Sequence, residues 1–187
     1  NSVGACTGRS AGLAPRKSLG QNFLVSESLR DALVADAGVR PGDIVLETGV
    51  GLGVLTEGLL NAGATVIGVI PAALMEREHG HRGLTELHVV QTMHERKRLM
   101  AERSHAFLAL PGGIGTMEEL FEVWTWRQLG YHDKPVGLLN TEGYYDALLS
   151  FIGTSVDGGF VVPAQRALLE VDHRASALLH RLWQLAI

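Results

Sequence analysis

Short apolar runs alternate with amphipathic segments from residue 43 to the end of the chain. Apolar runs of about four to eight residues are typical of buried strands, and recurrence every three or four positions is typical of helices. The predicted strands are residues 43–47, 65–70, 86–90, 106–110, 135–139 and 168–171, and the predicted helices are 55–60, 93–101, 117–130, 143–151 and 176–186. This alternation predicts an α/β fold in which helices cover both faces of a parallel sheet.

Composition narrows the class of protein. The chain has 187 residues, 46% apolar and 19% charged, which predicts a single globular domain over residues 1–187. No apolar run approaches the roughly 20 residues needed to span a membrane. One cysteine, Cys6, cannot form an intrachain disulfide, and this favours the cytoplasm. A net charge of −4 and a pI near 6.1 disfavour a broad nucleic-acid surface.

Glycines are abundant and clustered, at 23 of 187 residues. The most informative cluster, Pro-Gly-Gly-Ile-Gly-Thr at 111–116, follows a predicted strand and precedes a helix predicted to start near Met117. Glycines there let backbone N–H groups approach an anion, and the helix N-terminus adds donors. The alternative is a glycine-rich turn in which Thr116 caps the helix. Because the glycines exceed what a turn requires, we favour a phosphate site.

Two carboxylates follow this loop. Glu118 and Glu119 fall in the predicted first turn of the helix, where the helix dipole alone favours acidic residues. One of them could instead face a ligand beside the phosphate. A carboxylate next to a sugar can stabilise an oxocarbenium-like transition state or orient water.

A charged run, Met-His-Glu-Arg-Lys-Arg, occupies residues 93–98. On a helix, Arg96 shares a face with Met93 and Met100, while Glu95 and Lys97 point elsewhere. Such a run is usually a solvated face. An arginine that starts a helix after a parallel strand would, however, lie near the carboxyl edge of the sheet, where it could clamp a phosphate or ribose.

These two motifs together resemble the LONELY GUY family of cytokinin riboside 5′-monophosphate phosphoribohydrolases, often misnamed lysine decarboxylases. The resemblance runs from about residue 66 to the C-terminus and also includes residues 69–71, 120–126, 132–135 and 143–146. It implies a Rossmann-like three-layer fold, commonly a homodimer. The implied reaction hydrolyses the N-glycosidic bond of a nucleoside 5′-monophosphate and releases free base and ribose 5-phosphate.

The resemblance also implies residue roles. Arg96 and Glu119 match the catalytic arginine and glutamate of the family. The positions that match substrate-contacting residues are Glu78, Lys97, Gly113, Ile114, Gly115, Thr116, Met117, Glu118 and Thr125. The loop 113–116 is expected to hold the 5′-phosphate, and the Arg96 charge to keep Glu119 ionised. No metal and no organic cofactor is expected for this hydrolysis.

The N-terminal part resembles a different family, the rRNA adenine N6-dimethyltransferases, over residues from about 16 to 69. Residues 17–24 are similar to the N-terminal signature of that family, and residues 45–56 to its S-adenosylmethionine loop. The strand 66–71 lacks the acidic residue expected for the cofactor ribose, and no Asn-Leu-Pro-Tyr-type catalytic segment follows. We therefore interpret the chain as a chimera with a junction near residues 65–69, and predict a continuous parallel sheet across that junction.

Three functions stay open at this stage: the phosphoribohydrolase, an S-adenosylmethionine-binding methyltransferase-like protein, and a catalytically disabled dimeric scaffold. The eight histidines show no metal-ligand spacing. Phe121, Trp124 and Trp126 on the helix 117–130 are expected to serve core or dimer packing rather than base stacking. With Leu129, that helix is the predicted dimer surface.

Overall fold

The structure, a computed structural model, describes residues 27–47, 53–75 and 83–187. The chain divides into two compact units, residues 1–103 and 104–187. The predicted signature at 17–24 and most of the glycine loop at 49–53 lie outside the described residues, as does Glu78. Among the residues that are described, no helix is long and apolar enough to cross a bilayer.

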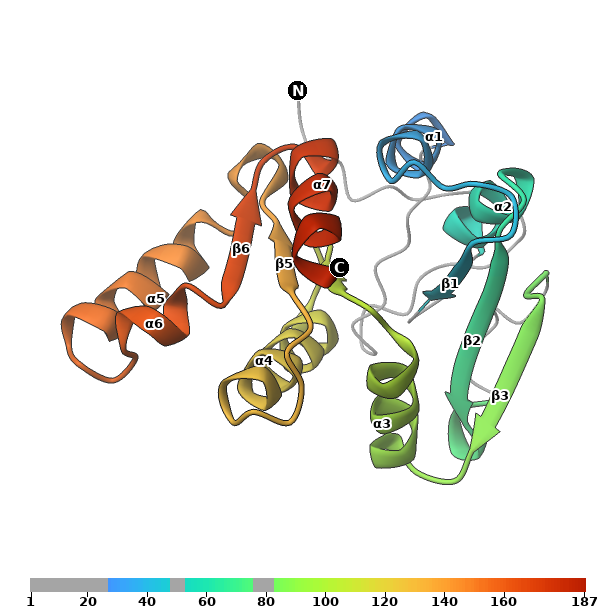
Figure 1. The fold of residues 1–187 in the computed structure, drawn as a ribbon. Coiled ribbons are helices and arrows are strands. Elements are labelled where there is room, and N and C mark those ends of the chain that lie inside the picture. Colours follow the sequence, from blue (N-terminus) through green and yellow to red (C-terminus); the bar gives the residue numbers. More distant parts are fainter. Residues whose placement is uncertain (1–26, 48–52, 76–82) are drawn as a thin grey trace. The chain divides into compact units, whose positions relative to one another are not determined.

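The first unit holds a parallel sheet in the order β1-β2-β3 (Figure 1). Its described elements are α1 (Glu27–Asp36), β1 (Ile44–Glu47), α2 (Val54–Asn61), β2 (Thr65–Pro71), the 3-10 turn η2 (Ala72–Leu74), β3 (Glu86–Val90) and α3 (Met93–Arg103). The central strand β2 is buried from Val66 to Pro71, as its continuous apolar run predicts.

The sheet is continuous across the predicted junction at residues 65–69. Val45 on β1 lies opposite Val66 on β2, and Ile67 on β2 lies opposite Glu86 on β3. Behind this sheet, Leu59 of α2 packs with Val66 and Ala64 in a small apolar cluster. The parallel pairing predicted for a chain joined within this strand is therefore present.

The second unit holds a parallel sheet in the order β4-β5-β6. Its elements are β4 (Phe107–Ala109), α4 (Ile114–Gln128), β5 (Val136–Leu139), the 3-10 turn η3 (Thr141–Gly143), α5 (Asp146–Asp157), α6 (Pro163–Arg166), β6 (Leu169–Asp172) and α7 (Ala175–Ala186). Both sheets are parallel and flanked by helices, which confirms the predicted Rossmann-like α/β fold class.

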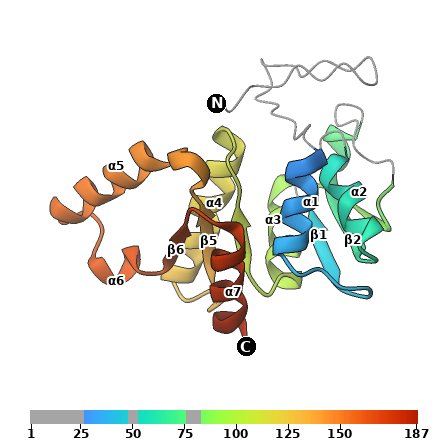
Figure 2. The same cartoon turned by 90° about the horizontal axis from the view of Figure 1, so that it is seen from above.

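Helices cover both faces of the second sheet. Successive residues of β5 point to opposite faces, so each face can pack against a different helix. Val136 and Leu138 pack in one cluster with Leu120 and Trp124 of α4. A β-carbon added at Gly137, between them, would contact Leu182 of α7 at 2.8 Å. Figure 2 shows α4 and α7 on opposite sides of this sheet. The burial of Trp124 confirms its predicted packing role.

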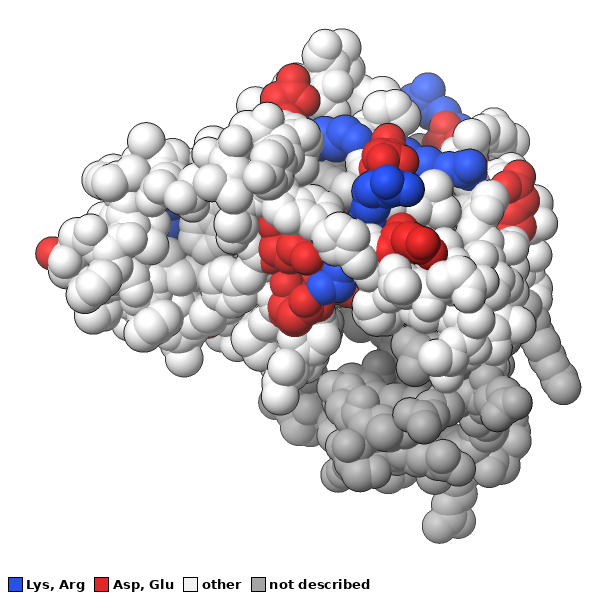
Figure 3. Space-filling model, turned by 90° about the horizontal axis from the view of Figure 1, so that it is seen from below, with Lys and Arg blue, Asp and Glu red and all other residues white. Residues whose placement is uncertain are grey.

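The segment from α5 to α6 has an apolar surface. Phe151, Phe160 and Val162 are exposed there. Figure 3 shows few charged side chains over these two helices, on the left of the view. The second unit therefore exposes an apolar patch over α5 and α6.

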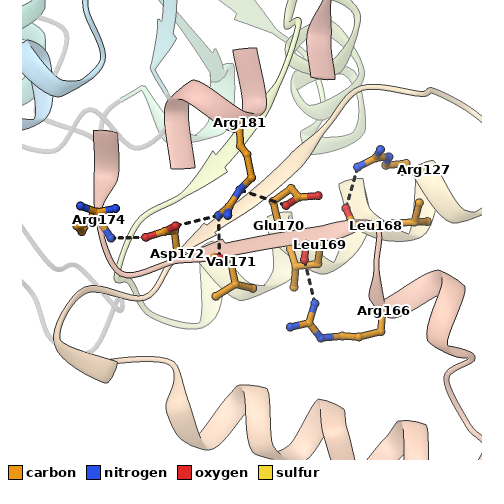
Figure 4. A network of polar contacts seen from close by, with 9 residues as sticks. All are labelled: Arg127, Arg166, Leu168, Leu169, Glu170, Val171, Asp172, Arg174 and Arg181. Carbon is orange, nitrogen blue, oxygen red and sulfur yellow. Dashed lines mark hydrogen bonds and ion pairs between the residues drawn. The ribbon is translucent and has the colours of Figure 1, made fainter. Parts of the chain in front are cut away.

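Arginines line the outer side of β6 (Figure 4). Arg127 of α4 donates to the carbonyl of Leu168 at 2.8 Å, and Arg166 of α6 donates to that of Leu169 at 2.9 Å. Arg181 of α7 donates to Val171 O at 2.9 Å. Within the described residues, β6 has β5 as its one strand neighbour, so Arg166 and Arg181 occupy carbonyl groups along the other edge of β6. Arg127 occupies the carbonyl of the turn residue just before the strand.

Carboxylates complete this network (Figure 4). Arg181 also pairs with Asp172 at 3.1 Å and with Glu170 at 3.4 Å. The backbone N–H of Arg174 donates to Asp172 at 2.9 Å, and this bond together with the Arg181 charge lowers the pKa of the Asp172 carboxyl.

Candidate functional site

The carboxyl edge of the second sheet brings together three loops that are far apart in sequence. Because β4, β5 and β6 run parallel, the segments that follow them begin at the same edge. These segments are residues 110–113 after β4, residues 140–145 after β5, and His173 after β6. In open α/β sheets this is the edge at which ligands bind.

Helix α4 begins earlier than the sequence predicts. Its N-cap is Gly113, with φ −92° and ψ −156°, and Ile114 is its first residue. The alternative in which Thr116 caps the helix is therefore wrong, because Thr116 already lies within the first turn. As a glycine, Gly113 has no side chain with which to bond the first-turn N–H groups. Such groups lack intrahelical partners and are suited to an anion.

The glycines of the loop differ in how much space surrounds the position of a β-carbon. A β-carbon on Gly112 would overlap the side chain of Thr116. A β-carbon on Gly115 would meet nothing within 4 Å, and its φ is not left-handed. Packing and backbone conformation therefore explain a glycine at 112 but not at 115, where open space adjoins the helix N-terminus.

The other residues predicted to contact substrate on α4 are spread along the helix. Ile114 is 85% exposed, Glu118 is exposed, and Glu119 and Met117 are partly buried. Thr125 is exposed about three turns after the helix start. Since the helix begins at Ile114, Glu118 and Glu119 fall in its second turn. The prediction that they belong to the first turn is wrong, and a stabilising effect of the helix dipole explains them less well.

Two tyrosines hold the loop, and the sequence reasoning did not single them out as site residues. The hydroxyl of Tyr145 donates to Leu110 O at 2.7 Å and accepts from the N–H of Gly112 at 3.1 Å. The hydroxyl of Tyr144 donates to Gly112 O at 2.9 Å. Burial raises the pKa of the Tyr145 phenol, which stays neutral. The available signal was the Gly-Tyr-Tyr-Asp sequence at 143–146, three residues after a predicted strand.

Asn140, which the sequence reasoning also missed, anchors these tyrosines. It is 1% exposed, and its Oδ1 accepts from the backbone N–H of Tyr145 at 2.7 Å. Its Nδ2 donates to Asp146 at 2.8 Å. Its backbone N–H donates to Asp172 O at 2.8 Å, and its carbonyl accepts from His173 Nδ1 at 2.9 Å. A buried polar side chain with this many partners rigidifies its surroundings.

In the first unit, the structure places Arg96 in the first turn of α3, after the carboxyl end of β3, as predicted. The helix start is well defined because Thr92 Oγ1 accepts from the Glu95 N–H at 3.1 Å. Arg96 is only 6% exposed, and its Nη1 lies 4.0 Å from Met93 Sδ. Lys97 beside it is partly buried. A guanidinium is rarely this buried, so Arg96 is not part of a solvated charged face.

The first unit also contains a partly buried acid at the end of β1. Thr56 donates to Glu47 at 2.6 Å, and Thr56 itself is 1% exposed. Burial raises the pKa of the Glu47 carboxyl, and the Thr56 bond partly opposes this. The strand β2 that follows, Thr65–Pro71, contains no acidic residue.

A pocket of about 560 Å³ lies at the other end of α4. It is lined by Arg127, Gly130, His132, Asp133 and Leu168, none of which is a predicted site residue. Over the described part of the chain, no group of three or more His, Cys, Asp or Glu side chains is arranged to hold a metal ion.

Comparisons with known proteins agree with the resemblances found in the sequence. Residues 52–182 match the family described as possible lysine decarboxylase. A cytokinin riboside 5′-monophosphate phosphoribohydrolase of Arabidopsis thaliana is 51% identical over 131 residues, which are 70% of this chain and 62% of that protein. A second one from the same plant is 48% identical over 135 residues, 72% of this chain and 63% of that protein.

A rice protein (Oryza sativa subsp. japonica) extends the similarity to most of the chain. It carries the name "Probable cytokinin riboside 5′-monophosphate phosphoribohydrolase" and is 41% identical over 183 residues, 91% of this chain and 82% of that protein. The chain spans about three fifths of the length of the two Arabidopsis relatives. Residues 12–67 also match the ribosomal RNA adenine dimethylase family. The two family matches overlap at residues 52–67, which is where α2 and the start of β2 lie.

Proposed function

Because the chain belongs to the LONELY GUY family of cytokinin riboside 5′-monophosphate phosphoribohydrolases, we propose that it hydrolyses the N-glycosidic bond of a nucleoside 5′-monophosphate. The substrate is a cytokinin riboside 5′-monophosphate or AMP, and the products are the free base and ribose 5-phosphate. The reaction needs no metal and no organic cofactor.

The observation that carries this proposal is the loop between β4 and α4. Its N-cap, Gly113, has no side chain that could bond the first-turn N–H groups, and Gly115 leaves open space beside them. This combination suits a phosphate group, which several backbone donors and the positive end of the helix dipole would bind. The proposed phosphate contacts come from Gly113, Ile114, Gly115 and Thr116.

The proposed chemistry centres on Glu119. A carboxylate beside the anomeric carbon stabilises the positive charge that develops on the ribose and orients the attacking water. The electrons of the C–N bond leave with the base, which takes up a proton, and the water hydroxyl stays on the sugar carbon. Arg96 is proposed to bind the ribose or phosphate. The remaining proposed contacts are Glu78, Lys97, Met117, Glu118 and Thr125.

The test is hydrolysis of AMP and of isopentenyladenosine 5′-monophosphate, with free base followed by chromatography. The parent protein should release base, and Glu119→Gln should lower the rate by about 10²–10⁴-fold, as removal of a reacting carboxylate does. Glu122→Gln is the matched control, since Glu122 is also partly buried on α4 and has no proposed role. It should keep the parent rate.

Absence of base release from folded parent protein would reject the proposal. It would favour a catalytically disabled scaffold, or the second candidate, an S-adenosylmethionine-binding protein. The match of residues 12–67 to the ribosomal RNA adenine dimethylase family favours that second candidate. The lack of an acid on β2 speaks against it. Calorimetric titration with S-adenosylmethionine decides between the two.

The proposal includes assembly as a homodimer in the cytoplasm. Phe121 and Leu129 on and after α4 are 38% and 58% exposed, and such apolar side chains suit a contact with a second copy. The single cysteine supports the compartment. Sedimentation of the parent and of Leu129→Glu tests the dimer. The parent should sediment as a dimer, and the variant should dissociate.

A further inference from the structure

The loop that the proposed function assigns to phosphate is held by hydrogen bonds from the side chain of a distant tyrosine, Tyr145. The Tyr145 hydroxyl bonds both Leu110 O and the Gly112 N–H, so one oxygen atom closes the turn around Pro111. Both bonds have good distances, 2.7 Å and 3.1 Å. The path of the backbone into α4 therefore depends on a side chain more than 30 residues away.

The Tyr144 hydroxyl fixes the next peptide unit. It donates to Gly112 O at 2.9 Å. In a planar trans peptide, the carbonyl of one residue and the N–H of the next point in opposite directions. The bond to Gly112 O therefore aims the Gly113 N–H away from Tyr144. A glycine–glycine peptide flips easily without such a restraint, because neither residue has a β-carbon.

The two tyrosines are themselves held rigidly. Their rings meet edge to face, with centroids 4.8 Å apart and planes at 87°. Asn140 ties Tyr145 to the carboxyl end of β5, and through Asp172 O and His173 to the end of β6. The orientation of the loop thus depends on the ends of the buried strand β5 and the partly buried strand β6 rather than on surface groups.

We propose that Tyr144 and Tyr145 are positioning residues for phosphate recognition, and that their hydroxyls set the direction of the Gly112 and Gly113 backbone groups. The inference rests on the proposed function of the loop. A purely structural role would account for Tyr145, which is 2% exposed and part of the core cluster. It does not account for Tyr144, which is 49% exposed, so that its hydroxyl bond adds little to the stability of the core.

The test compares three tyrosine-to-phenylalanine variants. Tyr144→Phe and Tyr145→Phe each remove a hydroxyl that bonds the loop, and Tyr131→Phe is the control because Tyr131 is 75% exposed after α4. Calorimetry measures the affinity for ribose 5-phosphate and for ribose. The difference between the two affinities is the contribution of the phosphate group. Steady-state hydrolysis of AMP gives kcat and KM, and thermal melting shows that each variant is folded.

We expect Tyr144→Phe to weaken ribose 5-phosphate binding and raise the KM for AMP by about five- to tenfold, with ribose binding and kcat close to the parent. Tyr145→Phe should have a larger effect on the same quantities, and Tyr131→Phe none. Parent-like affinity of Tyr144→Phe for ribose 5-phosphate would overturn the inference, as would an equal loss of affinity for ribose.

If the parent binds ribose 5-phosphate but releases no base, the proposed reaction is wrong, and the binding comparison still decides the role of the tyrosines. If the parent binds no ribose 5-phosphate, the inference about the tyrosines is wrong, and base release still decides the proposed function.

Discussion

The side chain of Thr116 fills the space that a β-carbon on Gly112 would need. Glycine at 112 is therefore a packing requirement of the turn. Gly112→Ala should lower the free energy of unfolding by about 1–3 kcal/mol, because the first turn of α4 must shift to admit the methyl group. Urea denaturation monitored by circular dichroism measures this change in the free energy of unfolding. Thr116→Ala in the Gly112→Ala background removes the nearest atom and should recover part of the loss. An unchanged urea midpoint for Gly112→Ala would contradict this packing.

Gly115 is the opposite case, since an added β-carbon has nothing within 4 Å. Gly115→Ala should fold with parent stability or gain up to about 1 kcal/mol, because alanine suits a helix better than glycine. It should nevertheless weaken ribose 5-phosphate binding at least tenfold, since the methyl group enters the space proposed for the phosphate. Gly153→Ala in α5, where the added β-carbon is equally unhindered, is the matched control and should bind as the parent does. Equal binding by both variants would argue against a phosphate at this loop.

His132 makes stability depend on pH. Its Nε2 donates to Val123 O at 3.0 Å, and its ring packs on Phe107 with centroids 5.2 Å apart. Burial lowers the pKa of His132 from its ordinary 6.5, with Lys134 and Arg127 adding to the effect and the Val123 bond and Asp133 opposing it. The unfolded chain thus binds the proton first as pH falls. Stability from this group is complete above about pH 6.5 and is lost as pH falls from there toward the lowered pKa.

His132→Gln isolates that dependence, because the amide of glutamine can still donate to Val123 O but does not titrate. The melting temperature of the parent should fall relative to the variant between about pH 6.5 and pH 5. Above pH 7.5, where both states are neutral, the difference between the two proteins should be constant. A difference that is constant over the whole range would show that the ring titrates equally in the folded and unfolded chains.

Glu142 and Gly143 form a strained corner between β5 and Tyr144. Glu142 has φ +52°, which disfavours residues with a β-carbon, and Gly143 has φ +71°. Glu142→Gly should raise the free energy of unfolding by about 0.5–1 kcal/mol by relieving that strain. Glu142→Ala removes the same carboxylate but keeps the β-carbon, so it should give no gain. Thermal or urea denaturation of the two variants checks this.

The strands could be predicted because burial leaves a direct mark on the sequence. Val136 to Leu139 are all buried, and this is the apolar run from which the strand was predicted. Helix α1 was missed because half of its ten residues are polar and most of the described ones are exposed. Helix α6, only Pro163–Arg166, is too short to show a period. The start of α4 was predicted too late because Gly115 has a poor helix propensity, a cost that the first turn tolerates.

The site could be predicted only where local sequence carries it. The glycine loop and Arg96 at the start of α3 were predicted because both belong to short contiguous motifs. The bonds from Tyr145 to the loop join residues 33 and 35 positions apart. No local pattern contains such a pairing, since it exists only once β4 and β5 lie side by side. The same holds for Asn140, a buried polar residue whose partners come from several loops.

The arginines along β6 have a consequence for the protein in a crowded solution. An unprotected strand edge is a template on which another chain can add a strand, the first step of many aggregates. Here the carbonyl groups of Leu168, Leu169 and Val171 are already bound by guanidinium groups from α4, α6 and α7. A strand that approached this edge would have to displace Arg166 and Arg181 before forming its own ladder along β6. Side chains that stabilise the fold of the second unit thus also protect it against misassembly.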